Sequence, residues 1–60
     1  MKLVDLKDNI PKFHRIYFVC IRQAFGFKTR EAYAEWSDNG FILVDTVLFN
    51  DEYIFGFYLE

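Results

Sequence analysis

The sequence FILVDTVLF at residues 41–49 is followed, after Asn50, Asp51 and Glu52, by YIFGFYLE at residues 53–60. Both segments are rich in β-branched and aromatic residues, which favour strands. The three polar residues between them are typical of a tight turn. The two segments therefore predict an antiparallel β-hairpin at the C-terminal end of the fold.

The predicted hairpin has two apolar faces. With a two-residue turn, the first face carries Ile42, Val44, Leu48, Phe55, Phe57 and Leu59, and the second carries Leu43, Val47, Phe49, Ile54 and Tyr58. An antiparallel sheet with one face in water normally shows polar residues there, but the second face has only Asp45 and Glu52. Because large exposed apolar patches usually mark interaction surfaces, we expect this face to bind another molecule.

Upstream of the hairpin, the sequence predicts a short strand and two helices. Residues 2–6 alternate polar and apolar side chains, which indicates a strand. Residues 11–25 place basic side chains on one side and apolar ones on the other at helical spacing, and Pro11 suits the first turn. Thr29 is a suitable N-cap for a second helix over residues 30–38, which Asn39-Gly40 would end.

Residues 13–25 also have a competing interpretation. The segment IYFVCI at residues 16–21 consists of residues with high β propensity, so a strand is the alternative to a helix here. With the helix, the chain is an α+β domain over residues 1–60. Its element order is then strand, helix, helix, strand, strand (β-α-α-β-β).

The chain has more apolar material than a protein of its size can enclose. A 60-residue chain hides only about 60% of its unfolded surface, whereas 53% of its residues are hydrophobic and 22% are aromatic. We therefore expect several large apolar side chains to lie near the surface. Two helices can cover one side of the sheet, and self-association would cover the other; the alternative is a monomer in which the first helix crosses the far side.

Charge is distributed unevenly along the chain. Residues 1–30 contain all seven basic residues and only Asp5 and Asp8 of the nine acids, which gives +5, whereas residues 31–60 carry seven acids and no basic residue, which gives −7. Such asymmetry can steer an oppositely charged partner or a second copy. The alternative is that the two halves neutralise each other in the folded chain.

The cysteine content and the length of the apolar runs predict where in the cell the protein is found. Cys20 is the only cysteine, so no internal disulfide forms, and a reducing compartment such as the cytoplasm is expected. The longest apolar run, residues 16–21, is far shorter than the roughly 18 residues that a membrane span needs. Asp5 interrupts the apolar stretch that a signal peptide would require. We expect neither a membrane association nor export.

The sequence offers no set of residues for catalysis. His14 and Cys20 are six residues apart, which places them about 120° apart around a helix, so they would not form a thiol–base pair. One histidine and one cysteine lack the paired spacing of a metal site. We predict no catalytic residue, no metal site and no cofactor, and therefore no enzyme.

The preferred function is that of a protein-interaction module. We expect a small regulator or inhibitor that forms a dimer through the hairpin and binds a partner protein. Aromatic residues dominate the centres of interfaces, and charged residues form their rims. The predicted contact residues are Phe49, Tyr53, Ile54 and Tyr58, with Asp45, Asp51 and Glu52 as the rim.

The alternative function is DNA binding. A helix, a turn at Gly26, a second capped helix and a hairpin follow one another, an order that resembles the winged helix-turn-helix family. The resemblance implies that the second helix enters the major groove and that the hairpin is the wing. It would place Lys28, Thr29 and Arg30 beside a DNA phosphate group. Lys12, Arg15 and Arg22 would be further contacts with the DNA backbone. Acids on the same helix, Glu31 and Glu35, would repel DNA, which favours the protein-interaction hypothesis.

Overall fold

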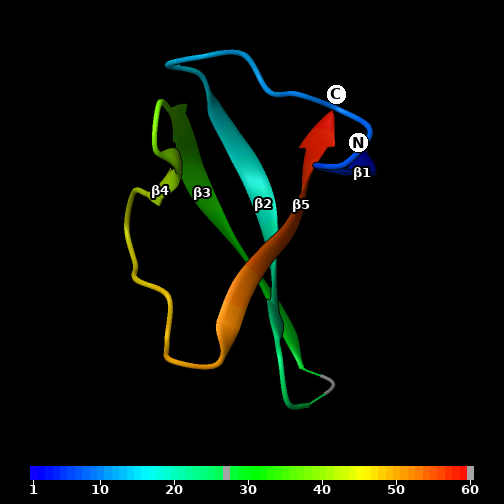
Figure 1. The fold of residues 1–60 in the computed structure, drawn as a ribbon, viewed down its shortest axis with the longest axis vertical. Coiled ribbons are helices and arrows are strands. Elements are labelled where there is room, and N and C mark those ends of the chain that lie inside the picture. Colours follow the sequence, from blue (N-terminus) through cyan, green and yellow to red (C-terminus); the bar gives the residue numbers. More distant parts are fainter. Residues whose placement is uncertain (27, 60) are drawn as a thin grey trace.

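The computed structural model describes residues 1–26 and 28–59, and within them the chain forms five strands and no helix. The strands are β1 (Lys2–Asp5), β2 (Ile16–Gln23), β3 (Thr29–Ser37), β4 (Gly40–Leu43) and β5 (Glu52–Leu59). They form one antiparallel sheet of order β1-β5-β2-β3-β4 (Figure 1). The expected α+β class is therefore wrong, because the fold is all-β. No helix in this part of the chain could cross a membrane.

The first expected helix is replaced by β2. Its side chains alternate: Tyr17, Val19 and Ile21 are buried on one side, whereas Ile16 and Phe18 lie on the other. Apolar residues on both faces of a strand weaken the period-two signal, and the flanking basic residues imitate a helical stripe. The competing strand interpretation of residues 16–21 is confirmed.

The second expected helix is replaced by β3, which pairs with β2 along most of its length. Ala32 lies opposite Val19 and Ala34 opposite Tyr17, so small side chains of β3 face large side chains of β2. This pairing buries Ala34 completely. Alanine favours helices in isolation, but packing against a central strand outweighs that preference of well under 1 kcal/mol per residue.

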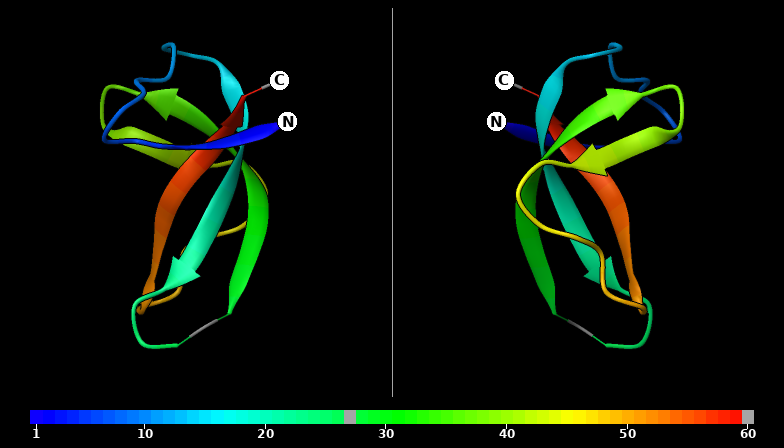
Figure 2. Two further views of the ribbon diagram at one scale, coloured as in Figure 1. Left: turned by 90° about the vertical axis from the view of Figure 1, so that its right-hand side faces the viewer. Right: turned by 90° about the vertical axis from the view of Figure 1, so that its left-hand side faces the viewer.

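The expected C-terminal hairpin is wrong, because its two segments do not pair with each other in the described residues. β4 ends at Leu43 and pairs with β3, whereas β5 lies between β1 and β2. Residues 44–51 connect the two strands and pass along one side of the sheet (Figure 2, right). A tight hairpin joins β3 and β4 instead, and Gly40 begins β4 with φ of 93°, a conformation that glycine adopts at little cost.

The two terminal strand predictions are confirmed. The strand expected at residues 2–6 is β1, and the one expected at residues 53–60 is β5, with Glu60 outside the described residues. β5 pairs on both sides, with β1 and with β2, which suits a segment with apolar side chains on both faces.

The core lies on one side of the twisted sheet. Its buried hydrophobic residues are Val4, Tyr17, Val19, Ile21, Ala34 and Phe57, and partly buried neighbours include Trp36, Phe41 and Ile54. The ring of Tyr17 packs edge-on against Phe57 at 5.0 Å and against Phe41 at 6.3 Å between centroids. These rings join β2, β4 and β5 on the core side.

Gly56 allows β1 to join the sheet. It lies opposite Asp5 of β1 and Cys20 of β2, so two strands approach its backbone. A Cβ atom at this position would collide with the carbonyl oxygen of Val4. The absence of a side chain is therefore a steric requirement of this strand order.

Candidate functional site

The side of the sheet opposite the core carries aromatic and aliphatic side chains at its surface. We call this side the open face and define it by Leu3, Ile16, Phe18, Tyr33, Ile42 and Tyr58. Ile16, Tyr33 and Ile42 are each 55% exposed. The expectation that large apolar side chains lie near the surface is confirmed.

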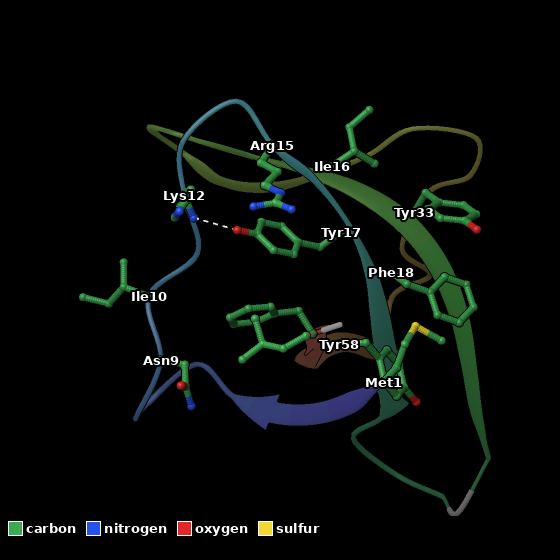
Figure 3. Close-up of a pocket in the computed structure, with 12 residues that line it drawn as sticks. Met1, Asn9, Ile10, Lys12, Arg15, Ile16, Tyr17, Phe18, Tyr33 and Tyr58 are labelled. Atoms are coloured by element: carbon green, nitrogen blue, oxygen red, sulfur yellow. Dashed lines mark hydrogen bonds between the residues drawn. The ribbon is translucent and has the colours of Figure 1, made fainter.

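The open face is built from two adjacent cross-strand rows. In the first row, Leu3 lies opposite Tyr58 and Phe18 lies opposite Tyr33. The ring of Phe18 lies 5.1 Å from that of Tyr33 and 5.5 Å from that of Tyr58 between centroids, and Figure 3 shows Phe18 and Tyr33 projecting to the same side. The second row is Ile16, Glu35 and Ile42. Because each row lies two residues from the next along a strand, the apolar side chains of the two rows adjoin, with Glu35 between Ile16 and Ile42.

Charged side chains of both signs lie within this patch and on the same side of the sheet beside it. Glu31 and Glu35 come from β3, and Glu35 lies 3.5 Å from Nδ1 of His14. Arg22 of β2 places its guanidinium 3.6 Å from the centre of the Phe55 ring. The hydroxyl of Tyr58 donates a hydrogen bond of 3.5 Å to Glu31, and burial, together with the negative charge of Glu31, raises the pKa of Tyr58. The open face thus combines an apolar row with a second row that contains Glu35, and Glu31 and Arg22 lie farther along the same side of the sheet.

Cys20 lies two residues after Phe18 in β2, opposite Glu31 of β3 and Gly56 of β5. The residue is 5% exposed, and burial and the charge of Glu31 raise the pKa of its thiol. A thiol in this environment stays protonated near neutral pH and is a poor nucleophile. In residues 1–26 and 28–59 no group of three or more histidine, cysteine, aspartate or glutamate residues is placed to hold a metal ion.

The structure divides the expected interaction residues among several places. Phe49 is 62% exposed in the connection 44–51, Tyr53 is 45% exposed in β5, and Ile54 packs against the core. Asp45 and Asp51 also lie in the connection, and the backbone carbonyl of Asp51 accepts a hydrogen bond from the N–H of Ala24. Only Tyr58 belongs to the open face.

Arg30 and Glu52 form an internal ion pair. Nε of Arg30 donates to Oε2 of Glu52 at 3.0 Å, and Nη2 donates to Oε1 at 2.8 Å. The guanidinium also donates to the Thr46 hydroxyl at 3.2 Å and to the Val47 carbonyl at 2.8 Å, and its carbon lies 5.1 Å from the centre of the Phe49 ring. The Glu52 side chain is 6% exposed, so the pair holds the connection and leaves neither charge free for a partner.

The remaining expected phosphate contacts lie in two groups at different parts of the sheet. Arg22, Lys28 and Thr29 line a hollow of about 420 Å³ with Tyr53, near the β2–β3 turn. Lys12 precedes β2, and Arg15 directly adjoins its first residue. Since the described residues contain no helix, the winged helix-turn-helix resemblance is overturned: the chain has no recognition helix, and its hairpin wing is absent.

Sequence reasoning missed most of the open face. Its residues in β2 and β3 were assigned to helices, which separated Phe18 from Tyr33. The period-two alternation of residues 30–36, with Ala32, Ala34 and Trp36 on one side and acids with Tyr33 on the other, carries the signal that would have found it.

Comparison with known proteins shows that no family model, no curated protein and no solved structure matches this chain. Its function is therefore inferred from its own side chains.

Proposed function

We propose that this chain is a non-catalytic protein-interaction module that associates with a second copy of itself through the open face. The observation that supports this is the exposed aromatic and aliphatic patch centred on Phe18 and Tyr33. The chain exposes 4610 Å², compared with about 4100 Å² for a typical monomer of its mass. The exposed side chains include large apolar ones such as Tyr33 and Ile42, whose burial is favourable.

The chemistry of the open face suits a second copy. A two-fold symmetric interface places the same surface of both protomers in contact, so the surface must be complementary to itself. A face with one sign of charge would repel its copy. Here Arg22 lies on the same side of the sheet as Glu31 and Glu35, so the arginine of each protomer can approach an acid of the other while the apolar side chains pack together.

The size of the molecule limits the strength of this association. Its two larger dimensions are 29 and 21 Å, so a flat face covers about 600 Å². Standard interfaces bury about 800 Å² per partner. We therefore propose a dimer with a dissociation constant on the order of micromolar. A reversible dimer of this kind exposes the same face to a partner protein when it dissociates.

In this role the chain acts by binding, as a regulator or inhibitor of its partner, and does no chemistry itself. We place it in the cytoplasm, because its single buried cysteine needs no oxidising compartment. The contact surface proposed from the sequence, on a C-terminal hairpin, is replaced here by the open face.

Sedimentation equilibrium over about 5 to 500 μM tests this proposal. The wild-type chain should pass from monomer to dimer across this range. Tyr33→Ser and Ile42→Ser should each weaken the dimer about tenfold or more, because both remove exposed apolar side chains from the patch. Phe25→Ser is the matched control, since Phe25 is 88% exposed in the β2–β3 turn, outside the open face. A wild-type monomer at every concentration, or an equal loss in Phe25→Ser, would overturn the proposal.

A further inference from the structure

A hollow of about 750 Å³ lies between the β1–β2 connection and the ends of β2 and β5 (Figure 3). It exists because the ladder between β2 and β5 stops at the pair Val19 and Phe57. Among the described residues, Ile16, Tyr17 and Phe18 have no backbone ladder partner in β5, while β5 continues beside β1. The two strands separate here, and the connection of residues 6–15 forms the opposite wall.

The wall of this hollow is more apolar than polar. Tyr17 and Phe57 line it with their packed rings, and Ile10 and Leu59 extend the apolar surface. The volume falls within the range of about 300 to 1000 Å³ that is typical of small-molecule sites. Since apolar walls favour an apolar body in the occupant, a fully polar ligand fits poorly.

Donor groups gather at one end of the hollow. The backbone N–H of Lys12 donates a 2.9 Å hydrogen bond to the Tyr17 hydroxyl, which leaves the O–H of Tyr17 able to donate. The guanidinium carbon of Arg15 lies 5.7 Å from the centre of the same ring, and Figure 3 shows Arg15, Lys12 and Tyr17 together. Lys12 and Arg15 both line the hollow, so two basic residues and the Tyr17 hydroxyl belong to its wall.

These positive charges have no acidic partner in residues 1–26 and 28–59. The ion pairs there are His14 with Glu35 and Arg30 with Glu52, and the described residues that line the hollow include no aspartate or glutamate. Two basic residues without an acid in the lining favour an anionic group in the ligand. Higher negative charge is disfavoured, because Glu31 and Glu35 lie on the adjoining strand and the chain as a whole carries −2.

We propose that this hollow binds a monoanionic amphiphile, a small molecule with one carboxylate and an aliphatic body. The carboxylate lies between Lys12 and Arg15 and accepts a hydrogen bond from Tyr17, and the aliphatic body lies along Phe57 and Leu59. This activity is additional to the proposed self-association, but the hollow and the open face share Ile16, Phe18, Tyr33 and Tyr58, so the ligand and a second copy would compete for that surface. The two cations lie outside the open face, so they separate the two activities experimentally.

Titration of the ¹⁵N-labelled full chain with octanoate, followed by amide chemical shifts, tests the proposal. Octanoate should produce saturable shifts at Lys12, Arg15 and Tyr17. Octanol and octylammonium, which share the chain but lack the carboxylate, should bind at least about tenfold more weakly. Equal affinity for the three probes, or no saturable shift with octanoate, would overturn the proposal.

Charge variants locate the carboxylate. The double substitution Lys12→Gln with Arg15→Gln should weaken octanoate binding at least about tenfold. Lys7→Gln with Lys28→Gln removes the same charge from positions outside the hollow, and its affinity should stay within about twofold of wild type. An equal loss in both double variants would show that only overall charge matters and would contradict the site. Lys12→Gln alone, at an exposed position, provides the test should the first double variant not fold.

Discussion

The guanidinium of Arg30 and the carboxylate of Glu52 meet through two hydrogen bonds, Nε to Oε2 at 3.0 Å and Nη2 to Oε1 at 2.8 Å. The two residues are 22 positions apart, on β3 and β5. The backbone N–H of Phe49 donates to the same carboxylate at 3.0 Å. This cluster closes the connection of residues 44–51 over the end of the sheet, and paired bonds of this geometry are among the stronger charge-assisted contacts.

The Glu52 carboxylate should make folding stability depend on pH in the acid range. The hydrogen bonds from Arg30 and from the Phe49 backbone lower its pKa from an ordinary 4.5 to about 2. The contribution of this carboxylate to the free energy of unfolding is therefore present above pH 4.5 and is lost as the pH falls towards 2. Urea unfolding at pH 6, 4.5, 3 and 2.5 measures this loss.

Two variants connect that pH dependence to the pair. Glu52→Gln removes the titrating group, and Arg30→Met removes the charge that lowers the pKa, so both should flatten the fall in unfolding free energy between pH 4.5 and 2.5. A wild-type slope in both variants would show that other carboxylates cause it.

Gly56→Ala should destabilise the fold by about 1 to 3 kcal/mol, since the added methyl group meets the Val4 carbonyl. The loss of stability should be greatest in β1, which pairs with β5 at this glycine. Hydrogen exchange should show lost protection at Leu3 to Asp5, with the β3–β4 amides as the internal control. Uniform loss across the sheet, or no loss, would disagree with the proposed steric role.

Cys20 should react slowly with an aromatic disulfide reagent at pH 8. It is 5% exposed, and burial with the nearby Glu31 charge raises the pKa of its thiol, so little thiolate is accessible. The reaction rate should rise steeply with urea, in parallel with unfolding. Rapid labelling of the native chain would mean that the thiol is open to solvent.

Trp36→Phe should change the unfolding free energy by less than about 1 kcal/mol, even though the Trp36 ring packs against Phe41 at 4.8 Å. The indole Nε1 of Trp36 is buried and has no hydrogen-bond partner among the described residues. An unpaired buried donor costs about 1 to 3 kcal/mol, so its removal offsets much of the lost packing. Trp36→Ala, which loses the ring itself, should cost about 3 kcal/mol. Equal losses in the two variants, measured by urea unfolding, would show that the indole nitrogen is satisfied.

The strands at the two ends of the chain could be predicted because their signal is local. Residues 2–6 alternate, and residues 53–60 are aromatic and β-branched. β2 was misassigned, because apolar side chains on both faces of residues 16–21 remove the alternation that distinguishes a strand from a buried helix. β3 was misassigned because Ala32 and Ala34, which favour helices, are needed opposite the large residues Val19 and Tyr17.

The partners of β4 and β5 depend on contacts that the local sequence does not show. Val44 to Phe49 has the composition of a strand, but these residues form a connection that Arg30 holds through Thr46 and Val47. Arg30 lies 16 positions before Thr46, and no pattern in residues 41–60 indicates its role. The surplus of apolar side chains could be predicted from composition, whereas the identity of the exposed ones required the pairing of β2 with β3.

Intermolecular nuclear Overhauser effects provide the most direct test of the proposed dimer. In a sample that mixes ¹³C-labelled and unlabelled chains at about 500 μM, effects should connect the Tyr33 and Phe18 rings of one copy to the methyl groups of Ile16 and Ile42 of the other. The absence of such effects, or effects confined to residues 44–51, would contradict association through the open face.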